Sequence, residues 1–95
     1  MRFCMTLKVI PSGRFKRDLR TAARRGYNFD LLTEVVNTLA ERRPLPEKNR
    51  DHALSGNYDG CRECHIAPDW LLIYQSDEDS LKLYLMRTGT HSDLF

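Results

Sequence analysis

The chain has 95 residues, of which 41% are hydrophobic and 29% are charged. This length suits one domain spanning residues 1–95, and the composition is that of a globular protein rather than a disordered chain or a disulfide-dense scaffold. A chain of this size hides only ~60–65% of its unfolded surface, so we expect no deeply buried cofactor. No apolar run approaches the ~20 residues of a membrane span, and residues 1–8 lack the apolar stretch of a secretion signal. We therefore expect a cytoplasmic protein with no membrane segment.

The formal net charge of +2 hides an asymmetry along the chain. Residues 1–50 carry 12 basic and 5 acidic side chains, a balance of +7, whereas residues 51–95 carry 3 basic and 8 acidic ones, a balance of −5. The densest basic cluster consists of Arg14, Lys16, Arg17, Arg20, Arg24 and Arg25. Within it only Asp18 opposes the positive charge. Such a run either follows a nucleic-acid phosphate backbone or forms an ordinary solvated helix face.

The first half of the chain predicts a strand followed by a helix. Apolar residues alternate with polar ones at the start of the chain, which indicates a half-buried strand. Its apolar positions are Met5, Leu7 and Val9. After Pro11-Ser12-Gly13 the apolar spacing becomes that of one helix face, with Ser12 as the cap and Gly26 as the end. The apolar positions of this helix are Phe15, Leu19, Ala22 and Ala23.

A second helix follows almost at once. Either Asn28 or Asp30 can cap it, and Pro44 and Pro46 end it. Its apolar stripe consists of Leu31, Leu32, Val35, Val36 and Leu39. Because the joint between the two helices is so short, we expect them to lie antiparallel as a hairpin.

The second half of the chain predicts a series of strands separated by turns. We expect these strands at residues 54–56, 61–66, 70–74 and 81–86. The segment 70–74 is apolar on both faces and should be a central strand. The resulting order is β-α-α-β-β-β-β. This order favours an α+β fold in which an antiparallel sheet is covered on one face by the helical hairpin, leaving the other face available to a ligand.

The run Cys61-Arg62-Glu63-Cys64-His65 matches C-x-x-C-H, the attachment signature of c-type haem. Covalent haem also needs export and a second axial ligand, and no export signal is visible. In a strand, residues i and i+3 point to opposite faces, so the two cysteines cannot face one porphyrin or one zinc ion without a bend. Small apolar packing residues are the favoured interpretation, with a metal- or haem-binding protein as the alternative.

Three histidines near predicted strand ends form the more informative set. These are His52, His65 and His91, and Asp69 follows His65 by four residues. Antiparallel strands can bring such ends to one edge of the exposed sheet face. An imidazole, with an ordinary pKa of ~6.5, can give or take a proton at neutral pH. Together with Asp69 and Arg87, the histidines suit metal-independent phosphodiester cleavage by proton transfer, and a zinc site is the rival interpretation.

Three runs of the sequence resemble the YafQ branch of the RelE/ParE toxin superfamily. They are Asp51–Gly56, Gly60–Tyr74 and Arg87–Phe95, with the motifs D-H-x-L-x-G, H-x-x-P-D-W-x-L-I-Y and R-T-G-T-H-x-x-L-F. The resemblance covers nearly the whole chain and is specific from Asp51 onward. The chain departs from the family pattern at Cys61 and Cys64, where the family commonly has an aromatic and a small residue.

The resemblance implies a RelE-like fold and a ribosome-dependent mRNA endonuclease from a bacterial type II toxin–antitoxin pair, which cuts the codon in the ribosomal A site. The catalytic residues it implies are His52, His65, Asp69 and His91. Phe95 matches an aromatic residue expected to stack on an mRNA base. Arg87 opens the last motif and is either a phosphate clamp or an ion-pair partner for nearby acids.

Our hypothesis for the roles makes Asp69 the general base, with His65 or His52 as alternatives, and makes His91 the general acid beside Phe95. The basic cluster would hold 16S ribosomal RNA. The implied partner is a cognate antitoxin, a small dimeric DNA-binding protein whose acidic segment covers basic surface. Two alternatives remain on the same fold: a ParE-like inhibitor of DNA gyrase, and a toxin that only binds its antitoxin.

Overall fold

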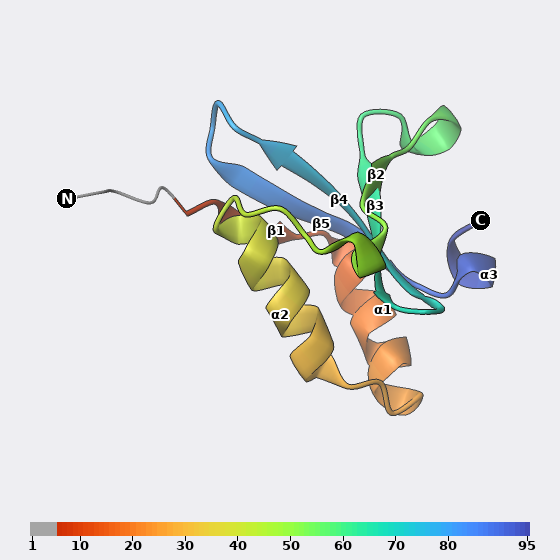
Figure 1. Ribbon diagram of the computed structural model, residues 1–95. Coiled ribbons are helices and arrows are strands. Elements are labelled where there is room, and N and C mark those ends of the chain that lie inside the picture. Colours follow the sequence, from red (N-terminus) through yellow and green to blue (C-terminus); the bar gives the residue numbers. More distant parts are fainter. Residues whose placement is uncertain (1–5) are drawn as a thin grey trace.

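One five-stranded sheet forms the middle of the molecule, and two helices cover one of its faces (Figure 1). The computed structural model describes residues 6–95, so Met5, a predicted member of the first strand, lies outside the described residues. The strands are β1 (Lys8–Pro11), β2 (His52–Ala53), β3 (Arg62–Ala67), β4 (Trp70–Asp77) and β5 (Lys82–Gly89). The helices are α1 (Gly13–Arg24), α2 (Phe29–Ala40) and α3 (His91–Leu94), with the short 3-10 helices η1 (Glu47–Asn49) and η2 (Gly56–Tyr58).

The strand order across the sheet is β1-β5-β4-β3-β2. It confirms the predicted α+β fold, the order β-α-α-β-β-β-β along the chain and the central place of the 70–74 segment. The predicted antiparallel sheet needs one correction, because β1 pairs with β5 in parallel and the sheet is mixed. A tight hairpin requires antiparallel neighbours, but β1 reaches the rest of the sheet through α1 and α2, which leaves its direction unconstrained.

Two short elements differ from the prediction. The strand expected at residues 54–56 is instead β2 at His52–Ala53, and Gly56–Tyr58 forms η2. The tail after β5, for which we predicted no element, forms α3. A capping box between Thr90 and Asp93 begins this helix. The Thr-x-x-Asp spacing was the available sequence signal for that helix start.

Side-chain caps begin both long helices at the predicted places. The Ser12 hydroxyl accepts a hydrogen bond from the Phe15 amide at 3.0 Å, and the side chain of Asn28 caps α2 rather than that of Asp30. Two positions of the predicted apolar faces are wrong. Ala23 is exposed because it lies ~100° round α1 from the buried Ala22, and Leu31 is exposed at the edge of the α2 stripe.

The edge strand β1 is less buried than its alternating pattern predicts. Leu7, just before the strand, is buried, whereas Val9 is exposed on the edge of the sheet. Among the helices within residues 6–95, none is long and apolar enough to cross a membrane.

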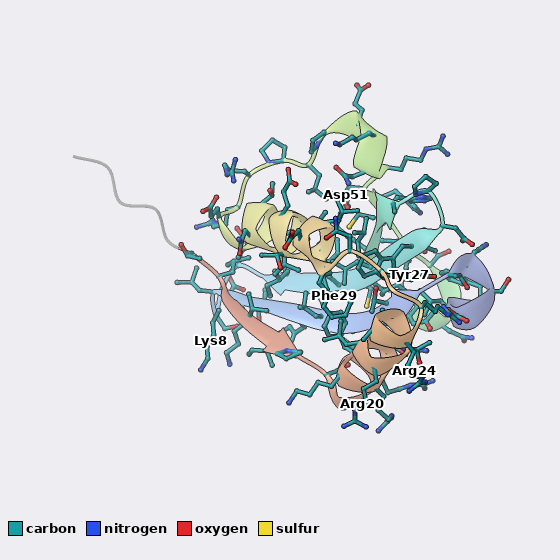
Figure 2. All side chains as sticks on the ribbon, turned by 90° about the horizontal axis from the view of Figure 1, so that it is seen from below. Lys8, Arg20, Arg24, Tyr27, Phe29 and Asp51 are labelled. Atoms are coloured by element: carbon teal, nitrogen blue, oxygen red, sulfur yellow. The ribbon has the colours of Figure 1, made fainter. Side chains whose placement is uncertain are left out.

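Apolar side chains pack on both faces of the central strand β4. On the helix-covered face, Leu72 is fully buried, and the ring of Trp70 lies 4.8 Å from that of Tyr27 and 6.1 Å from that of Phe29. Figure 2, seen from below, shows Tyr27 and Phe29 in the space between α1 and α2. On the other face, Ile73 is also fully buried. The sheet is thus sandwiched at its centre, and this rigid centre supports the strand ends.

Leu72→Ala should lower the free energy of unfolding by ~2–5 kcal/mol, because it leaves a cavity at the centre of the core. Leu31→Ala removes the same atoms from a side chain that is 39% exposed and should cost less than ~1 kcal/mol. Urea denaturation of both variants measures the difference. Equal losses would contradict the burial described here.

Candidate active site

The sheet face opposite α1 and α2, here called the open face, is only partly open. A second apolar cluster lies on it, formed by Cys61, Leu71, Ile73 and Leu94 with the partly buried Leu54, Tyr58 and Met86. The segment around η2 and the helix α3 therefore cover part of this face. The predicted ligand surface is confined to the polar residues that surround this cluster.

One row of directly paired residues crosses four strands of the sheet. His52 on β2 pairs with Glu63 on β3, and Glu63 pairs with Ile73 on β4. Ile73 in turn pairs with Arg87 on β5. Directly opposed residues present their side chains on the same face of a sheet. With strands ~4.8 Å apart, the row spans about 14 Å, which brings His52 and Arg87 to the open face.

A second row lies two residues further along the same strands. His65 pairs with Leu71, and Leu71 pairs with Gly89. Asp69 and His91 lie just beyond this row, and Oδ1 of Asp69 accepts a hydrogen bond from the backbone N–H of His91 at 3.2 Å. The backbone pairing thus brings Asp69 and His91 together at the end of the face that carries His65. Within residues 6–95, no hydrogen bond joins two imidazole rings.

Both ring nitrogens of His52 face acceptors. Nδ1 lies 2.7 Å from the carbonyl oxygen of Arg50, and Nε2 lies 3.4 Å from Oε1 of Glu63. Because a carbonyl oxygen can only accept, this contact assigns the proton of a neutral ring to Nδ1. The short η1 segment also holds His65, since the Asn49 side chain donates to the His65 carbonyl at 2.7 Å. One loop therefore fixes the surroundings of two predicted catalytic histidines.

Glu63 is a site residue that we did not single out from the sequence. Its side chain is buried, and Oε2 has no hydrogen-bond partner among the described residues. A buried carboxylate oxygen without a partner is costly and uncommon away from functional sites. The available signal was its alternation with His65, since residues two apart in a strand share a face.

The end of the chain presents two aromatic rings, that of His91 on α3 and that of Phe95 directly after it. The rings of His91 and Phe95 lie 4.9 Å apart, and Tyr58 meets Phe95 edge-on at 5.5 Å. The Tyr58 hydroxyl donates to the Leu94 carbonyl at 3.2 Å, which ties the η2 segment to α3. Phe95 remains 58% exposed, so one side of its ring is available to a planar ligand rather than being folded into the core.

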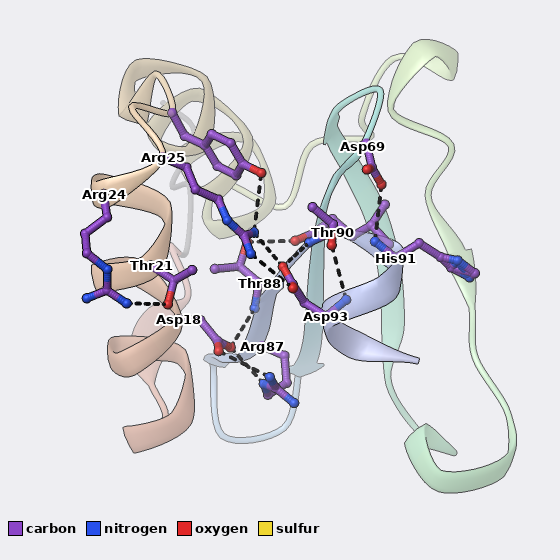
Figure 3. A network of polar contacts seen from close by, with 12 residues as sticks. Asp18, Thr21, Arg24, Arg25, Asp69, Arg87, Thr88, Thr90, His91 and Asp93 are labelled. Carbon is purple, nitrogen blue, oxygen red and sulfur yellow. Dashed lines mark hydrogen bonds and ion pairs between the residues drawn. The ribbon is translucent and has the colours of Figure 1, made fainter.

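Arg87 forms an ion pair with α1 rather than pointing freely into solvent. Its Nε and Nη2 atoms donate to the two oxygens of Asp18 at 2.7 and 3.2 Å, and the Thr88 amide donates to the same carboxylate at 3.1 Å (Figure 3). This hydrogen bonding raises the pKa of Arg87. Of the two roles considered for Arg87, the ion pair is the one observed. A cavity of about 410 Å³ adjoins it, lined also by Arg14, Arg17 and Tyr58.

The basic cluster on α1 has two kinds of member. Five of its side chains are exposed on α1 without an acidic partner among residues 6–95, namely Arg14, Lys16, Arg17, Arg20 and Arg24. Arg25 is different, because its guanidinium contacts Asp93 of α3 at 2.6 Å. Figure 2 shows Arg20 and Arg24 on the outer side of α1. Five of the six residues of the predicted basic surface are therefore exposed and without an acidic partner among residues 6–95, and their role in RNA binding stays a prediction.

A model of the family described as "Bacterial toxin of type II toxin-antitoxin system, YafQ" matches residues 7–95. The mRNA interferase toxin YafQ of Escherichia coli K12 is 36% identical over 85 residues, which are 88% of this chain and 90% of that protein. The chain belongs to the YafQ family. The resemblance inferred from the sequence motifs is thereby confirmed.

The structure is also similar to solved structures of toxins, including YafQ. A metal-bound toxin from Helicobacter pylori is 42% identical, with a TM-score of 0.88 over 94% of this chain and 99% of that one. A chain of the E. coli DinJ-YafQ toxin-antitoxin complex is 34% identical, with a TM-score of 0.85 over 95% and 98%. The YafQ match spans all four predicted catalytic residues, whose roles remain predictions.

Cys61 and Cys64 of this YafQ-family chain lie on opposite faces of the sheet. Cys61 belongs to the open-face cluster, whereas Cys64 is fully buried under the helices. They cannot bind one metal ion or one haem together. Burial raises the pKa of Cys64 to about 12, so at neutral pH it stays a protonated thiol rather than a thiolate ligand. Both are packing residues, as the strand geometry predicted.

Asp18→Asn should destabilise the fold by roughly 1.5–3 kcal/mol, the range for hydrogen bonds to charged groups. The reason is burial: the Asp18 and Arg87 side chains are only 16% and 14% exposed, so Arg87 would lose its countercharge in a poorly solvated place. Asp79→Asn, in the exposed β4–β5 loop, is the matched control and should change stability by less than ~0.5 kcal/mol. Chemical denaturation of the two variants decides between a structural ion pair and an incidental one.

Proposed function

We propose that this YafQ-family toxin is an endoribonuclease that enters the ribosomal A site and cleaves the mRNA codon there without a metal ion. The E. coli relative is named an mRNA interferase, and the side chains proposed for proton transfer come from residues on or beside the open face. Because ribosomes and mRNA are the proposed targets, the proposed place of action is the cytoplasm. The name of that relative gives the gyrase-inhibitor alternative no support.

The proposed reaction uses two proton transfers. The Asp69 carboxylate removes the proton of a ribose 2′-OH, with His65 or His52 as the alternative base, and the 2′ oxygen attacks the adjacent phosphorus. The bond to the 5′ oxygen breaks, and His91 gives that oxygen a proton. The products are a 2′,3′-cyclic phosphate and a 5′-hydroxyl. The observation that carries this proposal is the hydrogen bond from the His91 backbone N–H to the Asp69 carboxylate, which fixes the residue that bears the proposed acid next to the proposed base.

In this proposal the substrate is bound by aromatic stacking. Phe95 is exposed and lies against His91, so a base stacked on its free side would bring its own phosphate close to the proposed acid. Stacking on an aromatic ring is worth ~1–3 kcal/mol per base and tolerates every base. It would position the message without fixing a codon preference.

Two larger partners complete the proposal. The five exposed basic residues of α1 would contact phosphates of 16S ribosomal RNA, since they carry no acidic partner among the described residues. The cognate antitoxin would be a small dimeric DNA-binding protein, and a DinJ-YafQ toxin-antitoxin complex is known for the E. coli proteins. An acidic antitoxin segment laid on α1 would compete with RNA for the same charges.

His91→Ala should slow ribosome-dependent mRNA cleavage by ~10²–10⁴-fold, because it removes one of the two proton transfers. The measurement is the mapping of cleavage ends on translated mRNA, with the unchanged protein as reference. His91→Ala cleaving at the reference rate would exclude its role as the acid. Absence of cleavage by the unchanged protein would overturn the proposed function, and loss of cleavage when transition metals alone are chelated would overturn its metal independence.

Charge reversal at Arg17, Arg20 and Arg24 should weaken ribosome binding and flatten its dependence on salt. Each lost phosphate contact reduces the slope of log K against log salt by roughly 0.7–0.9. Binding titrations at several salt concentrations measure this slope. Reversal of three charges elsewhere, at Lys8, Arg43 and Lys82, is the control. An unchanged slope in the α1 variant would contradict an RNA surface on α1.

A further inference from the structure

The helix α3 has only four residues, too few to hold a fixed orientation by its own backbone hydrogen bonds. Yet it begins with His91 and is followed by Phe95, the proposed acid and the proposed stacking residue. What fixes α3 against the rest of the molecule therefore decides whether His91 and Asp69 keep their relative position. Leu94 of α3 packs in the open-face cluster. Three polar contacts also tie α3 to other segments: the β3–β4 turn through Asp69, the η2 segment through Tyr58, and the C-terminal cap of α1 through Arg25.

The contact with Arg25 has the geometry of a two-pronged clamp. Nη1 of Arg25 donates to Oδ2 of Asp93 at 2.6 Å, and Nη2 donates to Oδ1 at 3.2 Å. The same Asp93 carboxylate accepts from the Thr90 amide at 2.9 Å and so caps α3 (Figure 3). A side chain at Gly89 would come within 2.9 Å of Oδ2 of Asp93, so the glycine permits this close approach. One carboxylate thus both begins α3 and binds it to α1.

Arg25 is also connected to Asp69 through the side chains of Tyr27 and Trp70. The guanidinium lies 3.5 Å from the Tyr27 hydroxyl and 6.0 Å from the centre of its ring. Tyr27 packs on Trp70 at 4.8 Å, and Trp70 directly follows Asp69 in the chain. Asp69 then accepts the hydrogen bond from His91. The contacts form a closed ring that runs from Asp93 through Arg25 and Trp70 to the two proposed proton-transfer groups.

We propose that Arg25 is a positioning residue that holds α3 so that His91 and Asp69 stay in register, rather than a member of the RNA-binding surface. This rests on the proposed function. Its neighbour Arg24 has a different environment: the only hydrogen bond of its side chain among the described residues is to Thr21 of the same helix, at 3.3 Å. Figure 3 shows Arg24 directed away from α3 and Arg25 directed toward Asp93. The Asp93 partner raises the pKa of Arg25, and Arg25 lowers that of Asp93.

The test compares Arg25→Gln with Arg24→Gln in ribosome-dependent mRNA cleavage, because both changes remove one positive charge from neighbouring positions. Arg24→Gln should raise KM for programmed ribosomes. Arg25→Gln should instead lower kcat, by up to ~100-fold if His91 moves by about 1 Å, and Arg25→Lys should restore part of the rate. Equal effects of the two glutamine variants on kcat and KM would overturn the positioning role.

A second measurement keeps this inference separate from the proposed function. In the NMR spectrum of the isolated full-length protein, the ring of Phe95 should shift the His91 ring protons, and Arg25→Gln should reduce that shift and speed amide exchange at Leu94. Arg24→Gln should leave both signals unchanged. If the unchanged protein cleaves no mRNA, the function fails while this spectroscopic test still decides whether Arg25 orders α3. Unaltered spectra in Arg25→Gln would overturn the clamp.

The variant Asp93→Asn tests whether Arg25 acts through Asp93, because it keeps an oxygen to cap α3 but removes the charge. If Arg25 acts through Asp93, the double variant Arg25→Gln/Asp93→Asn should lose no more kcat than the worse single variant. Losses that multiply would show that the two residues act independently and would overturn the proposal.

Discussion

The register of the β2-β3-β4-β5 ladder is the constraint on which the rest of the site depends. A slip of one residue between two strands would turn every side chain of one strand to the other face. The ladder contains two irregularities, one in the β3–β4 pairing between His65 and Ala67 and one in the β4–β5 pairing between Ile73 and Tyr74. In the second, Tyr74 pairs with Leu85 while Ile73 pairs with Arg87, so Met86 is the extra residue.

The extra residue, Met86, determines which face of the sheet the Arg87 side chain lies on. Leu83 and Leu85 point to the helix-covered face, and strict alternation would send Arg87 to the same face. The bulge at Met86 instead sets Arg87 opposite Ile73, toward Tyr58 and the open face. Bulges commonly re-aim a side chain in this way. The local alternation of apolar residues therefore predicts the strand correctly but not the direction of the Arg87 side chain.

The sequence was informative wherever the cause of structure is local. Apolar spacing and caps predicted α1 and α2, period-two alternation predicted β3 and β5, and a run that is apolar on both faces predicted β4. The motifs carried the four catalytic candidates. The pairings that were missed join distant segments: Asp18 and Arg87 lie 69 residues apart in the chain, and Arg25 and Asp93 lie 68 residues apart. No periodicity within a short window can indicate such pairs. From the sequence we therefore assigned Arg25 to the basic cluster.

The carboxylates near the site are of two kinds, those paired with an arginine and those without an arginine partner. Asp18 and Asp93 are each held by an arginine fork, which occupies their oxygens and, at Asp93, lowers the pKa. A carboxylate held in this way is a poor proton acceptor. Within residues 6–95, Glu63 and Asp69 have no arginine partner, and they are the two carboxylates that contact His52 and His91. Arginine pairing thus supports the frame of the site, while the unclamped Asp69 keeps oxygens available to take a proton. This difference favours Asp69 over its acidic neighbours on α1 and α3 as the proposed base.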